Sequence, residues 1–237
     1  MRRFLHPALL GLLFLTACSL PWNWRSAQII EATPPDLTVD NSYFENLGCF
    51  KSPHCLPESF DLIDIPIESL GPVEDHLGGL TPTTPLAVAL NNSPYFLGEE
   101  NFVYTKHCLL SRYTRYIVYS DGEYQLLSTR DHLASFYAPI ETPEEAYSFA
   151  IAATGLRPLF EIAQETEVVF EQKVVEDSHV DAVEGGYVVH LYDTFICGCG
   201  PHYVDLVDVT VYTNGTLSIA DPLPVYRNPA LDDVCAD

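Results

Sequence analysis

The amino-terminal segment constrains the fold of this chain most, because it decides the chemical environment in which the remaining residues fold. Two arginines, Arg2 and Arg3, precede an apolar run from Phe4 to Phe14, and small residues follow. A basic start, a short apolar run and a small-residue exit are the pattern of a secretory signal peptide. The run is shorter than the ~20 apolar residues that a membrane-spanning helix needs. We therefore expect residues 1–17 to be a signal peptide and the rest to fold outside the cytosol.

The residues that follow the apolar run carry a second signal. They are Leu15, Thr16, Ala17 and Cys18. This order resembles the lipobox of bacterial lipoproteins, and the resemblance covers residues 1–18 only. It implies that the Cys18 thiol is linked to diacylglycerol and becomes the mature amino terminus. Since burial of acyl chains contributes about 0.8 kcal/mol per methylene, a lipid with two or three chains would be a stable membrane anchor.

The same resemblance indicates which membrane holds the anchor. Ser19, rather than an aspartate, follows Cys18. In bacteria with two membranes, a residue other than aspartate at this position favours an anchor in the outer membrane. In bacteria with one membrane, the anchor would lie in the outer face of the cell membrane. The membrane, contacted through the lipid at Cys18, is therefore the one partner that the sequence identifies.

The cysteine count agrees with this interpretation. The chain has seven cysteines, and setting Cys18 aside leaves Cys49, Cys55, Cys108, Cys197, Cys199 and Cys235. An even set of cysteines in an exported protein is typically oxidised, so we expect these six to form three disulfides. Six cysteines can pair in about fifteen different ways. Cys49 and Cys55 are close in sequence and are the first choice for a local pair. Cys197 and Cys199 are separated by one residue and are expected to bond outward, to Cys108 and Cys235.

Composition excludes several classes of function. The chain has 33 acidic residues against 11 lysines and arginines, and its formal net charge is −22. Such a surface repels phosphate backbones, so we expect no nucleic-acid partner and no polybasic membrane patch. A hydrophobic content of 47% is too high for an extended disordered chain and predicts a packed core.

The pattern along the chain divides it into three parts. After the signal peptide, residues 18–42 are expected to be a lipidated amino terminus and linker, since Pro34 and Pro35 interrupt a stretch without apolar periodicity. Residues 43–237 are expected to form a single α+β domain. Its first part is proline-rich as far as Pro94 and is predicted to consist mainly of loops.

Regular structure is predicted from Tyr113 onward. Strands at 113–119 and 124–127 flank Asp121-Gly122, which is typical of a tight hairpin turn. Ser128 and Thr129 precede a short amphipathic helix that includes Leu133 and Tyr137. Thr142, Pro143 and Glu145 then form a capping box with proline at the first helical position, and Gly155 suits a helix end. A second helix is therefore predicted over 143–154.

The remainder of the chain is predicted to be strands. Charged residues alternate with Val168, Phe170 and Val174, and longer strands follow at 187–195 and 203–212. Asn214-Gly215 predicts another hairpin, with a type I′ turn. The expected fold is α+β: an antiparallel sheet meander with one or two helices packed on one face, braced by disulfides.

One short segment offers donors for a metal ion. Cys197, Cys199 and His202 lie within six residues, and two sulfurs with an imidazole suit zinc or copper. Zinc sites usually space their cysteines more widely, and exported cysteines tend to oxidise, so disulfides are the favoured interpretation. No cofactor is expected, and the metal site at this loop stays an alternative.

No local motif predicts catalysis. The chain lacks the nucleophile elbow of hydrolases, the phosphate-binding loop and the paired histidines of metalloprotease helices. His190 and His202 fall in predicted strands, where a hydrogen-bonded sheet residue is the simpler interpretation. Tyrosines gather around the first hairpin and are expected to pack there, with a recognition face as the alternative; they are Tyr113, Tyr116, Tyr119, Tyr124 and Tyr137.

Three functional hypotheses follow. The leading one is a non-catalytic, lipid-tethered envelope protein that binds or scaffolds an unidentified protein or ligand. The second is a metal-binding envelope protein that uses Cys197, Cys199 and His202. The third is an envelope hydrolase whose catalytic residues are dispersed along the chain, as triads can be.

Overall fold

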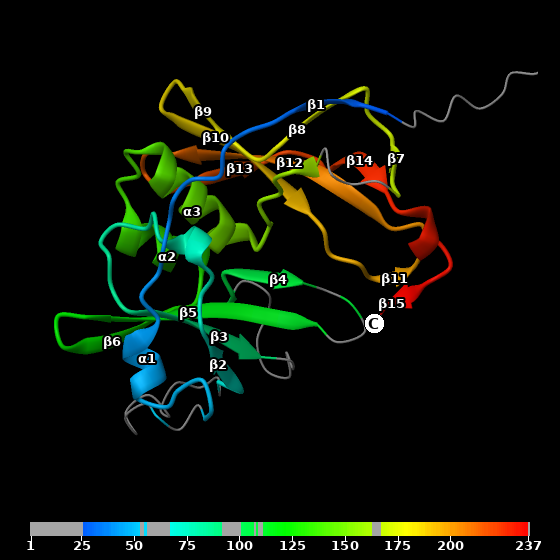
Figure 1. The fold of residues 1–237 in the computed structure, drawn as a ribbon. Coiled ribbons are helices and arrows are strands. Elements are labelled where there is room, and N and C mark those ends of the chain that lie inside the picture. Colours follow the sequence, from blue (N-terminus) through cyan, green and yellow to red (C-terminus); the bar gives the residue numbers. More distant parts are fainter. Residues whose placement is uncertain are drawn as a thin grey trace, which may run out of the picture.

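Two antiparallel sheets with a helix between them make up the computed structural model of this chain (Figure 1). The structure describes residues 26–52, 55, 67–91, 101–106, 108, 111–162 and 167–236. The predicted signal peptide and Cys18 lie outside the described residues. The expected α+β class, braced by disulfides, is confirmed.

The first sheet lies at the bottom of Figure 1 and contains five strands. Its order is β2 (Ser69–Gly71), β3 (Leu86–Asn91), β5 (Arg112–Ser120) and β4 (Tyr104–Lys106), and β6 (Glu123–Leu127) also pairs with β5. The predicted hairpin is β5 and β6. Asp121 and Gly122 both have positive φ, as a type I′ turn requires.

The second sheet lies above the first and contains six strands. Its order is β7 (Val169–Phe170), β14 (Leu223–Arg227), β12 (Tyr203–Tyr212), β10 (Gly186–Asp193) and β9 (Val180–Val183), and β13 (Leu217–Ile219) pairs with β12. The hairpin at Asn214-Gly215 is confirmed, but its turn type is not. Only Gly215 has positive φ, because the loop spans residues 213–215 and ends in a left-handed glycine.

Short elements join the sheets and cover their edges. The strand pairs are β1 (Gln28–Ile30) with β8 (Val174–Glu176), which is parallel, and β11 (Gly198–Cys199) with β15 (Cys235–Ala236). The helices are α1 (Ser42–Asn46), α2 (Arg130–Tyr137) and α3 (Pro143–Thr154), with 3-10 turns η3 (Asp75–Leu77) and η6 (Pro229–Leu231). Within the described part of the chain, none of the helices is long and apolar enough to cross a membrane.

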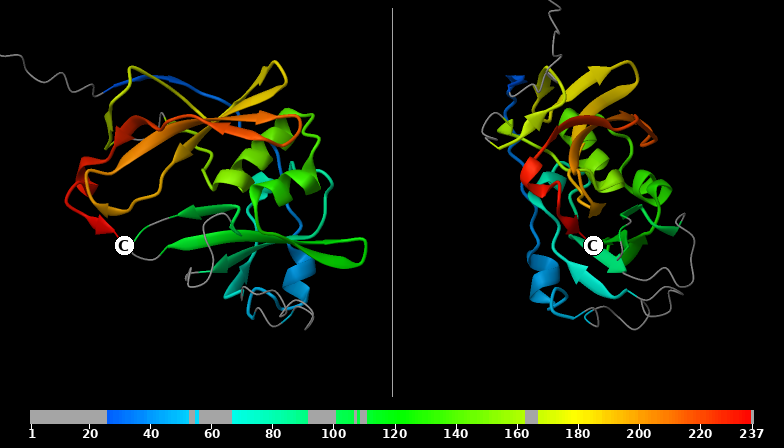
Figure 2. Two further views of the ribbon diagram at one scale, coloured as in Figure 1. Left: turned by 180° about the vertical axis from the view of Figure 1, so that it is seen from behind. Right: turned by 90° about the vertical axis from the view of Figure 1, so that its right-hand side faces the viewer.

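Helix α3 lies between the two sheets, towards one end of them, as the views in Figure 2 show from behind and from the side. It begins at the predicted capping box, where Thr142 and Glu145 bond reciprocally. Every residue from Ala146 to Ala153 is buried, which is typical of a helix covered on all sides. Side chains of both sheets, such as Val118 and Val209, join it in the main core. The helix ends at Gly155 in the left-handed conformation.

Two strands lie where the sequence predicted no regular structure. Residues 28–30 form β1 within the expected linker, because Ile29 packs in a core cluster with Val175. The proline-rich part contains β3, a central strand of the first sheet, where Leu86, Ala87 and Ala89 are buried. In the 167–174 stretch the predicted alternation also fails, since the chain bends between β7 and β8 and exposes Val174 while burying Val175.

The three disulfides follow the expected connectivity. Cys49 bonds Cys55 in a local loop beside α1. Cys108 bonds Cys197, and Cys199 bonds Cys235. The second bond links the segment after β4 to the segment after β10, so it joins the two sheets covalently. The third fastens the carboxyl-terminal strand β15 to β11.

Candidate functional site

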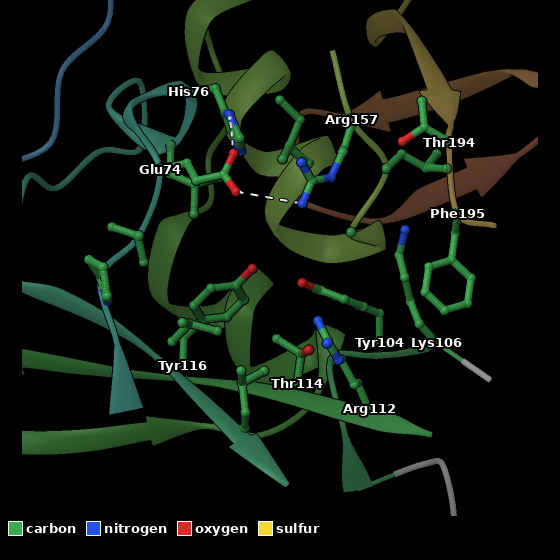
Figure 3. A pocket seen from close by; sticks show the side chains of 18 of the residues that line it. Glu74, His76, Tyr104, Lys106, Arg112, Thr114, Tyr116, Arg157, Thr194 and Phe195 are labelled. Atoms are coloured by element: carbon green, nitrogen blue, oxygen red, sulfur yellow. Dashed lines mark ion pairs between the residues drawn. The ribbon is translucent and has the colours of Figure 1, made fainter. Parts of the chain in front are cut away.

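A pocket of about 520 Å³ lies between the two sheets, beyond the carboxyl end of α3 (Figure 3). Its floor is the inner face of the first sheet, and residues 194–196 after β10 form the opposite wall. The loop that leads into η3 closes another side. The volume falls within the range of roughly 300–1,000 Å³ that small-molecule sites occupy.

Strand alternation explains which side chains face this pocket. Successive residues of a strand point to opposite faces, so residues two apart share one face. Arg112, Thr114 and Tyr116 of β5 line the pocket, and so do Tyr104 and Lys106 of β4. The residues between them on β5, Tyr113 and Arg115, face away from the pocket and contact the Phe102 ring.

The pocket concentrates positive charge in an acidic chain. Lys106, Arg112 and Arg157 all line it, which is three of the 11 lysines and arginines in the sequence. Glu74 is the one carboxylate in the lining that the structure describes. Figure 3 shows Lys106 and Arg112 extending from the first sheet and Arg157 lying across the cavity from them. The local charge is therefore opposite in sign to that of the chain as a whole.

Lys106 is the most buried of the three cations. Its side chain is 20% exposed, and its ammonium lies 3.7 Å from the Asp193 carboxylate and 5.3 Å from the centre of the Phe195 ring. Burial lowers the pKa of Lys106, and the nearby Asp193 carboxylate opposes that shift. An anion entering the pocket would restore part of the solvation that this ammonium loses.

Arg112 and Arg157 differ in how they are engaged. Arg157 Nη2 lies 3.8 Å from Glu74 Oε1, in an exposed pair of the kind that contributes little to stability. The backbone of Arg157 bridges to Tyr192 of β10, which fixes its place at the pocket wall. Arg112 is exposed and makes no ion pair with any described carboxylate. Its planar guanidinium is thus available for bidentate binding of an anionic group.

Neutral polar groups complete the polar side. Figure 3 shows the Tyr104 hydroxyl directed into the cavity near Arg112. His76 is partly buried, with Nδ1 3.4 Å from Glu74 Oε2. Burial lowers the pKa of His76 and outweighs the Glu74 carboxylate, which raises it. The lowered pKa favours the neutral imidazole ring near pH 7. Tyr116 donates instead to the Ala152 carbonyl, so it satisfies the end of α3.

The rest of the lining is apolar. It comes from β3, α3 and the loops on both sides: Val73, Leu77, Val88, Leu90, Ile151, Leu156, Phe195 and Ile196. A few charged and hydroxyl groups set in an apolar wall are typical of a site for a small organic molecule.

The metal alternative at Cys197, Cys199 and His202 does not hold. Both sulfurs are in disulfides, so this loop presents no thiolate. His202 is buried, and its Nε2 lies 2.9 Å from the Val234 carbonyl, within hydrogen-bond range. The loop braces the carboxyl terminus against the second sheet.

Other predicted residues lie outside the pocket, with one exception. Tyr116 lines it, whereas Tyr113 and Tyr137 are buried in packing. Tyr119 stacks on Tyr43 of α1, and Tyr124 completes that aromatic cluster. His190 is a hydrogen-bonded strand residue as predicted, and its ring bonds Asp208 of β12.

Sequence reasoning missed the pocket cations. Lys106, Arg112 and Arg157 come from separate segments, and none belongs to a motif. The one signal in the sequence was that lysine and arginine are scarce, 11 against 33 acidic residues, so each basic side chain was worth considering as a binding group.

The fold and the site together define a disulfide-braced α+β protein with a cationic pocket between two sheets. No protein family, no curated protein and no solved structure has detectable similarity to this chain. The inference about function therefore depends on the site alone.

Proposed function

We propose that this chain is a non-catalytic binding protein, exported and lipid-tethered, whose pocket between the two sheets binds a small organic anion. The observation that supports it most is the placement of Lys106, Arg112 and Arg157 around one cavity in a chain of net charge −22. The scattered acidic residues favour solubility, whereas cations gathered in a cavity favour recognition of negative charge.

The lining specifies the chemical class of the ligand. Arg112 and Lys106 suit a carboxylate or phosphate head, since charge-assisted hydrogen bonds are the strong ones. The apolar wall around Leu90, Leu156 and Ile196 suits an aliphatic or aromatic body. A ligand of this class has one charged end and one apolar end and fits within about 520 Å³.

Binding rather than catalysis fits the groups present. The described lining contains the hydroxyls of Thr114 and Thr194 but no serine or cysteine, and His76 faces Glu74 rather than a nucleophile. A hydrolase that forms a covalent intermediate needs a side-chain nucleophile and a base within hydrogen-bond reach of each other. The dispersed-hydrolase hypothesis therefore has less support than the binding hypothesis.

The location of the protein is the second part of the proposal. Three disulfides support an oxidising compartment outside the cytosol. The lipobox-like residues before Cys18 add a membrane anchor, and the folded part would face water. Mass spectrometry of the amino-terminal peptide from protein made in its own host tests this: a diacylglyceryl Cys18 is expected, and a free thiol or an intact leader would contradict it.

A pair of fluorescent probes tests the pocket. 1-Anilinonaphthalene-8-sulfonate carries an anionic head on an aromatic body, and N-phenyl-1-naphthylamine is nearly the same molecule without the sulfonate. We expect the native protein to bind the sulfonate saturably and at least about tenfold more tightly than the neutral probe, which corresponds to ~1.4 kcal/mol. Decanoate should displace it, and decanol should not. Equal affinity for both probes would contradict an anion site.

A further inference from the structure

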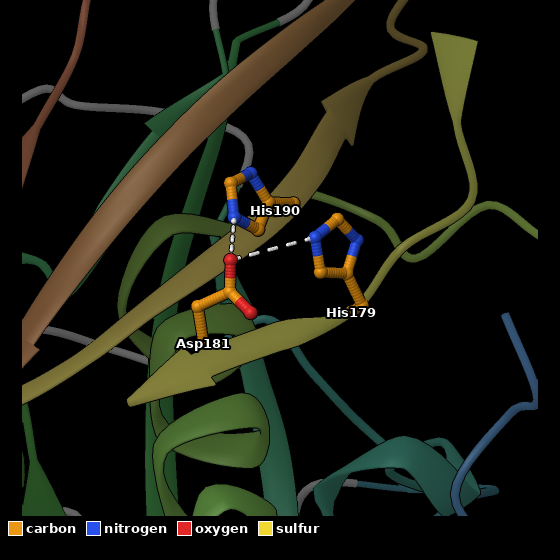
Figure 4. A group of neighbouring side chains, drawn as sticks. All are labelled: His179, Asp181 and His190. Carbon is orange, nitrogen blue, oxygen red and sulfur yellow. Dashed lines mark ion pairs between the residues drawn. The ribbon is translucent and has the colours of Figure 1, made fainter. Parts of the chain in front are cut away.

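A cluster of histidines and carboxylates lies on the outer face of the second sheet, away from the pocket (Figure 4). His190 of β10 points away from the core that its neighbours Val189 and Leu191 enter. His179 precedes β9, and Asp181 lies on β9 itself. The three side chains bring one donor atom each within 4.8 Å of one another.

The donor atoms converge on one carboxylate. Asp181 Oδ2 lies 3.5 Å from His190 Nε2 and 3.8 Å from His179 Nε2. Ligands joined to a tetrahedral metal by bonds of 2.0–2.1 Å are roughly 3.3 Å apart. The donor distances are therefore close to ligand spacing, but the two imidazole rings are stacked, with centroids 4.1 Å apart and 16° between their planes. At least one ring must turn about its side-chain bonds for both Nε2 lone pairs to point at one ion. Glu176 Oε2, 3.4 Å from His179 Nε2, is in position to be a fourth donor.

The far side of each ring is already held. His190 Nδ1 lies 2.7 Å from Asp208 Oδ1, and His179 Nδ1 lies 2.8 Å from the Asp177 carbonyl oxygen. A ring whose Nδ1–H donates in this way carries its lone pair on Nε2. Carboxylate and carbonyl partners of this kind are what orient metal-binding histidines.

One ring nitrogen is buried without a hydrogen bond. Among the described groups, His190 Nε2 is a buried polar atom that makes no hydrogen bond, although it faces Asp181. Burying a polar nitrogen without a hydrogen bond is costly. A metal ion would satisfy this nitrogen directly.

We propose that His179, His190 and Asp181, with Glu176 as the fourth ligand, bind a divalent transition metal of the zinc class. Two imidazoles favour zinc over calcium or magnesium, which prefer all-oxygen sites. The ion would join β8, β9 and β10, because Glu176 ends β8. This site is independent of the anion pocket, from which the second sheet separates it.

Calorimetric titration with Zn²⁺ tests the site, using the disulfide-bonded full chain without a polyhistidine tag and freed of metal by a chelator. We expect one ion per chain and a rise in the melting temperature on saturation. Asp181→Asn should weaken binding at least about tenfold, and the Asp181→Asn/His190→Gln variant should abolish it. Since Asp181 is 66% exposed, the single substitution should leave the fold intact.

His132→Gln is the matched control, because His132 is an exposed histidine on α2 that bonds only locally. It should bind Zn²⁺ as the unmodified chain does. Co²⁺ adds a readout of geometry, since a tetrahedral site gives intense visible absorption that Asp181→Asn should change. Failure to bind Zn²⁺ stoichiometrically, or equal affinity in the Asp181→Asn and His132→Gln variants, would overturn the proposal.

Discussion

The ammonium of Lys106, which lines the pocket, lies 3.7 Å from the carboxylate of Asp193. The pair joins the end of β4 in one sheet to the end of β10 in the other. The disulfide between Cys108 and Cys197 joins the same two chain segments a few residues further on. Two links, one ionic and one covalent, therefore hold the pocket walls at a fixed separation.

Removing that disulfide should affect both stability and binding. The Cys108→Ser/Cys197→Ser variant loses a bridge between residues 89 apart in sequence, so the free energy of unfolding should fall by about 2–4 kcal/mol in urea. Binding of the anionic naphthalene probe should also weaken, because the walls are freer to separate. The Cys49→Ser/Cys55→Ser variant is the control, because the two cysteines of its bridge are only 6 positions apart in the sequence and neither lines the pocket. Equal effects on binding in both variants would argue against a bracing role.

Gly155 should tolerate substitution less well than Gly122, although both glycines have a left-handed backbone conformation. A Cβ at Gly155 would lie 2.3 Å from the Tyr104 ring, and its φ is +68°, which disfavours any side chain. Gly122 has φ +84° but open space around it. Gly155→Ala should therefore lower the free energy of unfolding more than Gly122→Ala, for which about 1 kcal/mol is expected. Only Gly155→Ala should also weaken probe binding, because Tyr104 lines the pocket. A loss no larger than that of Gly122→Ala would contradict the contact.

Asp205 should destabilise the fold at neutral pH. It lies directly opposite Asp193 in the ladder between β10 and β12. Burial, and then the Asp193 charge, raise the pKa of Asp205 above its usual value. A raised folded-state pKa means that the folded state gains stability as pH falls through that pKa, because it binds the proton more tightly than the unfolded state. Asp205→Asn should therefore stabilise the protein at pH 7, by roughly 0.2–1 kcal/mol for relief of a cross-strand repulsion.

The advantage of Asp205→Asn should shrink as pH is lowered from 7 towards 4, because the raised pKa makes the native carboxyl take up its proton at a higher pH than a free aspartate does. Urea unfolding at both pH values measures this difference. Asp221→Asn, at an exposed position after β13, is the control for a simple change in net charge. An unchanged advantage at both pH values would contradict the assignment.

Local signals predicted the elements whose cause is local. The capping box at Thr142 and Glu145 fixed the start of α3, and Gly155 fixed its end, because caps act within one turn. The strand β3 was missed since prolines dominate its surroundings, yet pairing with β2 and β5 on both sides makes it a central strand. Tertiary pairing of this kind leaves no mark on a single segment.

The sites were out of reach for the same reason. The pocket cations are brought together only when β4, β5 and the end of α3 pack. His179 and His190 are 11 positions apart in the sequence, and the β9–β10 hairpin sets their distance. The disulfides were predictable because cysteine chemistry and export limit the choices, whereas lysines and histidines have many roles.

The affinity of the Arg112→Gln variant for 1-anilinonaphthalene-8-sulfonate tests the central claim most directly, because Arg112 is the pocket cation that no described carboxylate pairs with. Loss of a charge-assisted hydrogen bond of about 1.5–3 kcal/mol predicts a dissociation constant at least about tenfold higher than that of the unmodified chain. Lys173→Gln makes the same change of charge outside the pocket lining and should leave the constant unchanged. Equal dissociation constants for the two variants would contradict an anion-binding pocket between the sheets.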